Sequence, residues 1–327
     1  MSEQIRAVVV TRNGGPDVLE VQQRPMPQPS AGQLLVEVAA SGVNFIDVYR
    51  REGVYPVETP FVLGGECAGR VLRAGSAVTD FAVGDVVASA AAASGTHASA
   101  ALVDAEAAVP VPEGVQPDIA AASMLQGMTA HYLVHSTYQV REGDAVLVHA
   151  AAGGVGQLLV QMASAQGARV IGTVGSAAKA EVAQAAGADD VIRYGDVDDL
   201  AAAVREVVPE GVHVVYDGVG KATFEASLGS LRRRGLLALF GAASGQVPPF
   251  DLQRLNPAGS LFVTRPTLAH YASDRDELRW RAGDVLGSVA NGSLRIAVGG
   301  RYALEDAARA YDDLEGRRTT GKLLIVP

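Results

Sequence analysis

The stretch VLVHAAAGGVGQLLVQMA, residues 146–163, limits the fold more than any other feature of the chain. It has the pattern of a buried strand, a glycine-rich turn and a helix. From residue 145 to about residue 266, apolar strands and helical segments then alternate, and six strands are expected. Such alternation is typical of a parallel sheet with helices on both faces. We therefore predict an α/β protein with a doubly wound, six-stranded Rossmann domain.

The turn itself matches a dinucleotide-binding fingerprint with one departure. That fingerprint is G-x-G-x-x-G between a strand and a helix. Here the six positions run from Ala151 to Gly156, so alanine replaces the first glycine. Gly153 lets backbone approach a pyrophosphate, which rests on the helix N-terminus, and Gly156 lets the helix pack on the strand. The residues predicted to contact the cofactor at this turn are Ala152, Gly153, Gly154 and Val155.

The end of the second strand predicts which dinucleotide binds. An NAD-binding fold usually has an acidic residue there, which holds the ribose 2′-hydroxyl. The corresponding stretch GTVGSAAKAE has Gly175, Ser176 and Lys179, and its first acid is Glu181. A hydroxyl and an ammonium favour a 2′-phosphate, so we predict NADPH as the cofactor. The alternative for Lys179 alone is a solvated helix lysine, although the chain has only three lysines.

The rest of the chain is predicted to form a second domain. Up to about residue 120, short β-rich runs alternate with Gly and Pro, which suggests a barrel or sandwich. The last residues, GKLLIVP, are expected to return to this domain as a strand. We therefore predict a β-rich catalytic domain from residues 1–121 and 267–327, and a nucleotide-binding domain from residues 122–266. Within the latter, a helix is predicted over residues 222–234, ending in three arginines before Gly235.

Composition excludes several classes of protein. A net charge of −9 disfavours a nucleic-acid partner, which usually meets a basic surface. No apolar run reaches the roughly 18 residues of a membrane helix, and MSEQIRAVVV has no secretory pattern. The single cysteine, Cys67, rules out an internal disulfide and a multi-cysteine zinc site, and it is expected to be buried. A cytoplasmic protein without a membrane partner is predicted.

Stretches along nearly the whole chain resemble a known family. They are SGVNFIDVYRREGVYP, LGGECAGRV, LQGMTAHYLV, HAAAGGVGQ, GTVGSAAKAE, VVYDGVG and VTRPTL. In this order they are similar to the zinc-free quinone oxidoreductases, the zeta-crystallin-like group of the medium-chain dehydrogenase/reductase superfamily. The resemblance implies a GroES-like fold for the β-rich domain. It also explains Ala151, because an alanine-containing turn is common in that group.

The resemblance and the residues together predict no metal. Zinc-dependent members of the superfamily have a catalytic Cys, a His and a second Cys near the positions of Asn44, Gly65 and Gln126. Zinc prefers Cys, His or carboxylate ligands, so these three residues do not offer a usual site. His131 and His135 lie four residues apart on a predicted helix and form an alternative metal pair, but no third ligand is evident.

The resemblance also assigns site residues. It implies that Asn44, Tyr49 and Tyr55 are catalytic residues facing the nicotinamide, where amide and phenol donors polarise an acceptor carbonyl. The further cofactor-binding residues lie near the domain junction, after the third, fourth and fifth strands, or near the C-terminus: Gln126, Thr129, Tyr194, Val219, Phe240, Gly241, Ser244 and Arg317, the last with Arg318 as an alternative.

We therefore expect a metal-free, NADPH-dependent quinone oxidoreductase. One alternative is an NADPH-dependent reductase of activated C=C bonds, such as an enone, an enoyl compound or a 2-haloacrylate. Another is a non-catalytic NADPH-binding protein. GSLFVTRP, residues 259–266, is expected to be an apolar edge strand, and the resemblance implies that two copies pair there as a homodimer.

Overall fold

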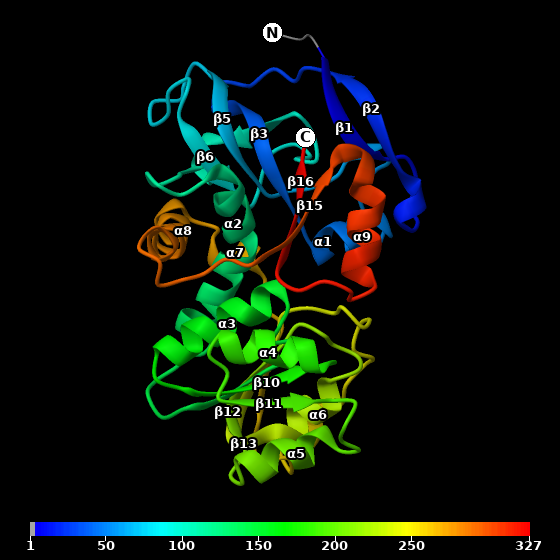
Figure 1. Ribbon diagram of the computed structural model, residues 1–327, viewed down its shortest axis with the longest axis vertical. Helices are drawn as coiled ribbons and strands as arrows, with labels where there is room; N and C mark the ends of the chain where they lie inside the picture. The colour runs from blue at the N-terminus through cyan, green and yellow to red at the C-terminus, as the bar shows by residue number, and fades with distance from the viewer. Residues whose placement is uncertain (1–3) are drawn as a thin grey trace. The chain divides into compact units, whose positions relative to one another are not determined.

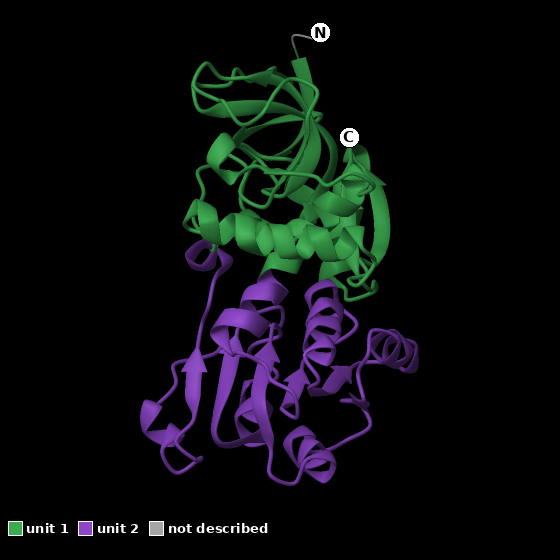
Figure 2. Ribbon diagram, turned by 90° about the vertical axis from the view of Figure 1, so that its left-hand side faces the viewer, with its two compact units in different colours: residues 1–128, 272–327 green, residues 129–271 purple. Residues whose placement is uncertain are grey.

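The computed structural model describes residues 4–327. The chain divides into two compact units (Figure 2): unit 1 comprises Met1–Met128 and Ala272–Pro327, and unit 2 comprises Thr129–Tyr271. The domain boundaries predicted after residues 121 and 266 stay predictions, and the first of them falls inside helix α2 (Pro117–Tyr132). Across the described residues, no helix combines the length and the apolarity needed to cross a membrane.

Unit 2 contains the predicted six-stranded parallel sheet. Its strand order is β11-β10-β9-β12-β13-β14, so the direction of winding reverses between β9 and β12. The six-stranded Rossmann prediction is therefore confirmed. The strands are β9 (Ala145–Val148), β10 (Arg169–Val174), β11 (Asp190–Arg193), β12 (Val212–Asp217), β13 (Leu231–Leu239) and β14 (Phe262–Thr264).

Helices cover both faces of this sheet, with α3 and α4 on one side and α5 packed beside α6 on the other (Figure 1). Leu147 and Ile171 from the strands pack with Val204 of α5 and Phe224 of α6 in one buried apolar cluster. The helices of unit 2 are α3 (Gly154–Ala165), α4 (Ala177–Ala185), α5 (Leu200–Val207), α6 (Phe224–Ser230), α7 (Leu268–Tyr271), a π-helical turn (Leu133–Thr137) and a 3-10 turn (Leu252–Leu255).

The helix predicted over residues 222–234 is too long. Helix α6 ends at Ser230, and the three arginines belong to strand β13. Leu231, which is 1% exposed, starts this strand beside Val212. The pairing of β12 with β13 shifts register between Val212 and Val214, and the extra residues of β13 at this shift include the three arginines. Arg234 has a φ of 58°. Burial of Leu231 thus overrides the helical continuation that sequence pattern suggests.

Unit 1 is built on two β-sheets. The larger has seven strands in the order β15-β16-β3-β5-β6-β8, with β7 also pairing β3, and the smaller has the order β2-β1-β4. The strands are β1 (Gln4–Val10), β2 (Leu19–Pro25), β3 (Gln33–Val43), β4 (Phe61–Val62), β5 (Cys67–Ala74), β6 (Val86–Ser89), β7 (Ala100–Asp104), β8 (Val109–Pro110), β15 (Val298–Ala303) and β16 (Lys322–Val326).

The C-terminal strand joins the N-terminal part of unit 1, as predicted. β16 runs antiparallel to β3, with Leu323 beside Val43, and parallel to β15. Cys67, at the start of β5, is 1% exposed, which confirms the expected burial. The helices of this unit are α1 (Phe45–Arg51), α2 as far as Met128, α8 (Arg275–Ala290) and α9 (Ala307–Glu315), with 3-10 turns at Pro16–Val18, Ala105–Ala107 and Leu304–Asp306.

Candidate functional site

The predicted cofactor residues of unit 2 gather at one edge of its sheet. They follow the carboxyl ends of five parallel strands, and parallel strands end at the same edge. β9 and β12, between which the winding reverses, lie side by side. The residues are Ala152, Gly153, Gly154 and Val155 after β9, Gly175, Ser176 and Lys179 after β10, Tyr194 after β11, Val219 after β12, and Phe240, Gly241 and Ser244 after β13.

Ala151 fits the turn because the neighbouring strand makes room for it. It is buried, and its N–H donates to the Thr173 carbonyl at 3.1 Å. A Cβ on Gly172 would lie 2.8 Å from the Ala151 Cβ, so glycine stands opposite the methyl group. The left-handed position of the turn is Ala150, with a φ of 51°. The missing first glycine is thus offset by Gly172 in the next strand.

The start of helix α3 has the geometry of an anion site. A Cβ on Gly156 would lie 2.2 Å from the Ala150 carbonyl oxygen, so only glycine allows this approach of helix to turn. The N-cap residue is Gly153, which has no side chain to accept from the first-turn N–H groups. The first N–H groups of a helix lack intrahelical partners and attract anions. This turn fits a pyrophosphate.

Four predicted residues lie together after β10 and β11. A Cβ on Gly175 would lie 2.3 Å from the Tyr194 hydroxyl, so the phenol rests against the glycine backbone. Ser176 caps helix α4, with its Oγ accepting from the Lys179 N–H at 3.3 Å. This leaves the hydroxyl proton of Ser176 to donate. Tyr194 is 49% exposed, so a phosphate can reach its phenol.

Asp217, at the end of β12, organises the loop that contains Val219. Its Oδ1 accepts from the N–H groups of Val219 and Gly220, at 2.8 and 2.9 Å. Its Oδ2 accepts from the hydroxyls of Thr223 and Ser227, at 2.7 and 2.8 Å. Four donors thus satisfy a fully buried carboxylate without a cation.

The loops after β12 and β13 are joined to each other. The Ser244 hydroxyl donates to the Val219 carbonyl at 2.8 Å. A Cβ on Gly218 would meet the Phe240 ring at 2.8 Å, and a Cβ on Gly241 would meet the Gly218 carbonyl at 2.5 Å. The predicted residues Val219, Phe240, Gly241 and Ser244 therefore form one connected edge.

His149, directly after β9, links this edge to the glycine turn. Its Nδ1 lies 2.8 Å from Thr173 Oγ1, and its Nε2 lies 3.0 Å from Ser227 Oγ. Since Ser227 also contacts Asp217, the ends of β9, β10 and β12 share one buried network. Burial lowers the pKa of His149, while the charge of Asp217 opposes that shift.

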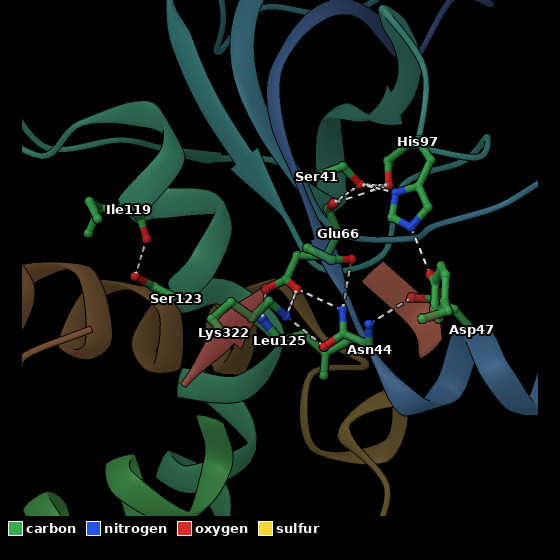
Figure 3. A network of polar contacts seen from close by, with 12 residues as sticks. Ser41, Asn44, Asp47, Glu66, His97, Ile119, Ser123, Leu125 and Lys322 are labelled. Carbon is green, nitrogen blue, oxygen red and sulfur yellow. Dashed lines mark hydrogen bonds and ion pairs between the residues drawn. The ribbon is translucent and has the colours of Figure 1, made fainter. Parts of the chain in front are cut away.

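In unit 1, Asn44 lies in a buried polar cluster (Figure 3). Its side-chain oxygen accepts from Lys322 Nζ at 2.6 Å, and its Nδ2 donates to Glu66 Oε2 at 2.8 Å. Lys322 and Glu66 pair directly at 2.5 Å, and their side chains are 1% and 0% exposed. The Leu125 N–H, on helix α2, donates to Glu66 Oε1 at 2.6 Å. We call Asn44, Glu66 and Lys322 the buried triad.

The buried triad bears on the role predicted for Asn44. Besides Glu66, its amide donates to the Gly42 carbonyl at 3.2 Å, so both amide hydrogens are engaged. The lysine ammonium on the oxygen side fixes the amide orientation. Asn44 is also only 4% exposed. As it stands, Asn44 has no N–H left to donate to an acceptor carbonyl.

The two predicted tyrosines lie together at the end of helix α1 and in the loop after it. Their rings meet edge to face, with centroids 5.6 Å apart and an interplanar angle of 77°. The Tyr55 N–H donates to the Tyr49 carbonyl at 3.0 Å, which fixes the loop against the helix. Tyr55 is 43% exposed. These residues form an aromatic surface that carries phenol groups.

Further buried titratable groups lie behind the start of α1. Asp47 accepts from the Asn44 backbone N–H at 3.0 Å, and burial raises the pKa of this carboxyl to about 6. His97 contacts Ser41 Oγ through Nδ1 and Tyr311 Oη through Nε2, both at 2.7 Å. Burial, followed by the charge of Lys322, lowers the pKa of His97 to about 3. This histidine is therefore neutral at physiological pH.

The remaining predicted residues are not brought into one place by either unit. Gln126 is half-buried in the part of α2 that belongs to unit 1, and Thr129 is 7% exposed in unit 2. Arg317 is exposed after helix α9, with a φ of 55°. Arg318 pairs with Asp313 at 3.0 Å. The role of these residues stays a prediction.

Sequence reasoning missed Glu66, Lys322 and Asp217. Two signals were available: Lys322 is one of only three lysines, and Asp217 ends an apolar strand in VVYDGVG. Nothing in the sequence pairs Glu66 with a residue 256 positions away. Within residues 4–327, His, Cys, Asp and Glu side chains form no group of three or more suited to a metal ion.

Comparison with protein families matches both parts of the chain. Residues 30–140 match an alcohol dehydrogenase GroES-like domain, and residues 154–275 match a family described as zinc-binding dehydrogenase. The GroES-like fold expected for the β-rich domain is thereby confirmed.

Similar proteins match over nearly the full length. A quinone oxidoreductase of Salmonella typhimurium is 43% identical over 97% of this chain and 98% of its own. A 2-haloacrylate reductase of a Burkholderia species is 40% identical over 99% of each chain. The structure of a mycobacterial protein complexed with NADPH is 49% identical, with a TM-score of 0.96 over 99% of this chain and 100% of the other.

Proposed function

The chain belongs to the quinone oxidoreductase family of the medium-chain dehydrogenase/reductase superfamily, and from this premise we propose that it reduces quinones with NADPH and without a metal. When bound, NADPH supplies a hydride that, with one proton, converts a quinone to a hydroquinone. The side chains of this chain bind the cofactor, hold the acceptor and stabilise charge on its oxygen.

Most of the proposed cofactor-binding residues lie in unit 2, whereas Gln126 and Arg317 lie in unit 1. The first turn of α3 holds the pyrophosphate, because Gly153 leaves its N–H groups uncapped by any side chain. Ser176, Lys179 and Tyr194 hold the 2′-phosphate, since a hydroxyl, an ammonium and a phenol can each donate to it. The loop after β10 has no acid before Glu181 to repel that phosphate. Arg317 is a further candidate by family resemblance, with Arg318, which pairs with Asp313 at 3.0 Å, as its alternative.

The observation that carries the acceptor assignment is the pair of Tyr49 and Tyr55. Tyr55 presents a partly exposed phenol, and Tyr49 supports it edge to face. A flat acceptor can pack against such rings, while a phenol donates to its carbonyl oxygen as negative charge develops there. Asn44 supports this aromatic surface indirectly, because it precedes helix α1, which contains Tyr49.

The acceptor class is tested by NADPH oxidation with quinones, enones and 2-haloacrylates. We expect quinones to give the highest kcat/KM. The second candidate is reduction of an activated C=C bond, which the similarity to the 2-haloacrylate reductase favours. A higher kcat/KM for enones or haloacrylates would select it. NADPH binding without turnover of any acceptor would select the non-catalytic alternative.

We propose that the reaction needs no zinc, because Asn44, Gly65 and Gln126 stand where zinc-dependent members have ligands. Purified protein should hold no stoichiometric zinc and should keep its activity in EDTA. One zinc per chain by elemental analysis, with activity lost to the chelator, would refute this.

We also propose a cytoplasmic homodimer. β14 is the last strand of its sheet and carries Phe262, which is 58% exposed. An apolar strand edge of this kind aggregates unless it is covered, and a second copy can cover it across a two-fold axis. Sedimentation at micromolar concentration should give a dimer, and a Phe262→Glu variant should shift it to monomer. Cell fractionation tests the location.

A further inference from the structure

Glu66 and Lys322 are buried charges for which the proposed reaction gives no use. They form the ion pair of the buried triad, and neither side chain is more than 1% exposed. The pairing of β16 with β3, and of β3 with β5, brings them together (Figure 3). A Cβ on Gly42 would lie 2.0 Å from Glu66 Oε2, so the backbone itself makes room for the pair.

Stability does not explain why the chain keeps this pair. Removing two charges from water costs free energy that can exceed their mutual attraction. Apolar replacements of similar volume are often neutral or stabilising. Buried ionic groups are kept in some proteins because they select one geometry, and here the geometry selected is that of Asn44.

The pair contacts two elements that carry predicted site residues. Through Asn44 it reaches the start of helix α1, whose fifth residue is Tyr49. Through Glu66 Oε1 it reaches Leu125, the neighbour of Gln126 on helix α2. Within the triad, hydrogen-bond donors face acceptors. Only one orientation of the Asn44 side-chain amide satisfies these hydrogen bonds.

We propose that Glu66 and Lys322 are positioning residues that hold Asn44, and with it the start of helix α1 and Tyr49, in the geometry that acceptor reduction requires. This inference rests on the proposed function. The pair acts only through its neighbours, because it is too buried to meet an acceptor itself.

The test is the double variant Glu66→Gln/Lys322→Met. It removes both charges together and keeps an oxygen that can accept from the Leu125 N–H. It also allows the Asn44 side-chain amide to rotate into the opposite orientation. We expect kcat/KM for quinone to fall by about 10- to 100-fold, mainly in kcat, because a small misplacement of reacting groups is costly. The dissociation constant of NADPH should stay within about twofold, since Ser176, Lys179 and Tyr194, which are proposed to hold its 2′-phosphate, lie in unit 2.

Two comparisons separate positioning from a merely structural role. Asn44→Ala should lower kcat as much as the double variant, and the triple variant should add little, because residues that act together are non-additive. The matched control is Arg301→Met/Asp118→Asn, which removes an exposed ion pair of the same unit. It should leave quinone kinetics unchanged.

The side-chain amide signals of Asn44 in ¹⁵N NMR give a readout that needs no turnover. We expect them to shift in the double variant and to exchange faster with water. If wild type reduces no quinone, the proposed function fails, and these signals still report on the orientation of Asn44. Unchanged signals, or unchanged kcat/KM in a folded double variant, would overturn the inference. If the double variant does not fold, unchanged kcat/KM in Asn44→Ala overturns it instead.

Discussion

Both units bury a carboxylate beneath their predicted site residues, but they satisfy it in different ways. In unit 1, Glu66 pairs with Lys322, which lies 256 residues away in sequence. In unit 2, Asp217 accepts from two backbone N–H groups and two hydroxyls, all within 10 residues of it. The first arrangement needs a second charge, and the second needs only neighbouring donors.

This difference shows how each unit depends on its own tertiary structure. The Asp217 cluster forms when one loop turns into helix α6, since its donors follow it directly along the chain. The buried triad forms only when the C-terminal strand has joined the sheet beside β3. The proposed acceptor residues should therefore be more sensitive to distant substitutions than the proposed cofactor residues.

The largest effect is expected from removing the cation of unit 1 alone. Lys322→Met leaves the Glu66 carboxylate buried without its cation, which should lower the free energy of unfolding by about 3–5 kcal/mol. Asp217→Asn should lower the free energy of unfolding by less, because the partners of Asp217 are neutral donors and no buried opposite charge is left without its partner. Urea denaturation measures both, and Arg301→Met, in an exposed pair, should change stability by about 1 kcal/mol or less. Equal costs for Lys322→Met and Asp217→Asn would remove the distinction between the units.

The buried histidine of unit 1 should make the stability of the protein depend on pH. The pKa of His97 is lowered from 6.5 to about 3, so the unfolded chain takes up a proton first as pH falls. The stability contributed by neutral His97 is complete above pH 6.5 and is lost as pH falls toward 3, by up to about 1.4 kcal/mol per pH unit.

The variants His97→Gln and His149→Gln compare the two units directly. His97→Gln should flatten the decline in stability below pH 6.5. His149→Gln should also flatten it, because burial lowers the pKa of that histidine too, although the charge of Asp217 opposes the shift. Thermal unfolding from pH 7 to pH 5 measures the slopes. A steeper slope in His97→Gln than in wild type would contradict the assignment of a neutral buried His97.

A smaller effect is expected at the partly exposed cofactor residues. Lys179→Ala removes a contact to the 2′-phosphate worth about 1.5–3 kcal/mol, so NADPH should bind roughly 10- to 100-fold more weakly. NADH lacks that phosphate, and its affinity should hardly change. Rising salt should weaken NADPH binding more than NADH binding. Equal weakening of both cofactors, measured by titration, would remove Lys179 from the phosphate site.

The smallest effect is expected at the exposed phenol of unit 1. Tyr55→Phe removes one hydrogen bond and keeps the ring, so kcat/KM for quinone should fall by roughly 2- to 10-fold, or about 0.5–1.5 kcal/mol. The affinity for NADPH should hold. Quinone kinetics identical to wild type would make Tyr55 a packing residue, and a loss of NADPH affinity would contradict the division of roles between the units.

Most of the parts that sequence predicted have a local cause. The turn from Ala151 to Gly156, the absence of an acid before Glu181 and the alternation of strands with helices each depend on neighbours in sequence. The return of GKLLIVP to the first domain was also predicted, although it is distant. The extent of α6 was not, because burial of Leu231 started β13 earlier than the helical pattern indicates.

The sequence by itself therefore determined the Rossmann fold, the glycine turn after β9 and the residues at each strand end, because a turn or a cap is built from residues a few positions apart. Only the tertiary structure decided that Gly172 accommodates Ala151, that Lys322 meets Glu66, and that Asn44 has already donated both amide hydrogens. Each of these depends on which strands become neighbours in a sheet, and no short-range pattern records that pairing.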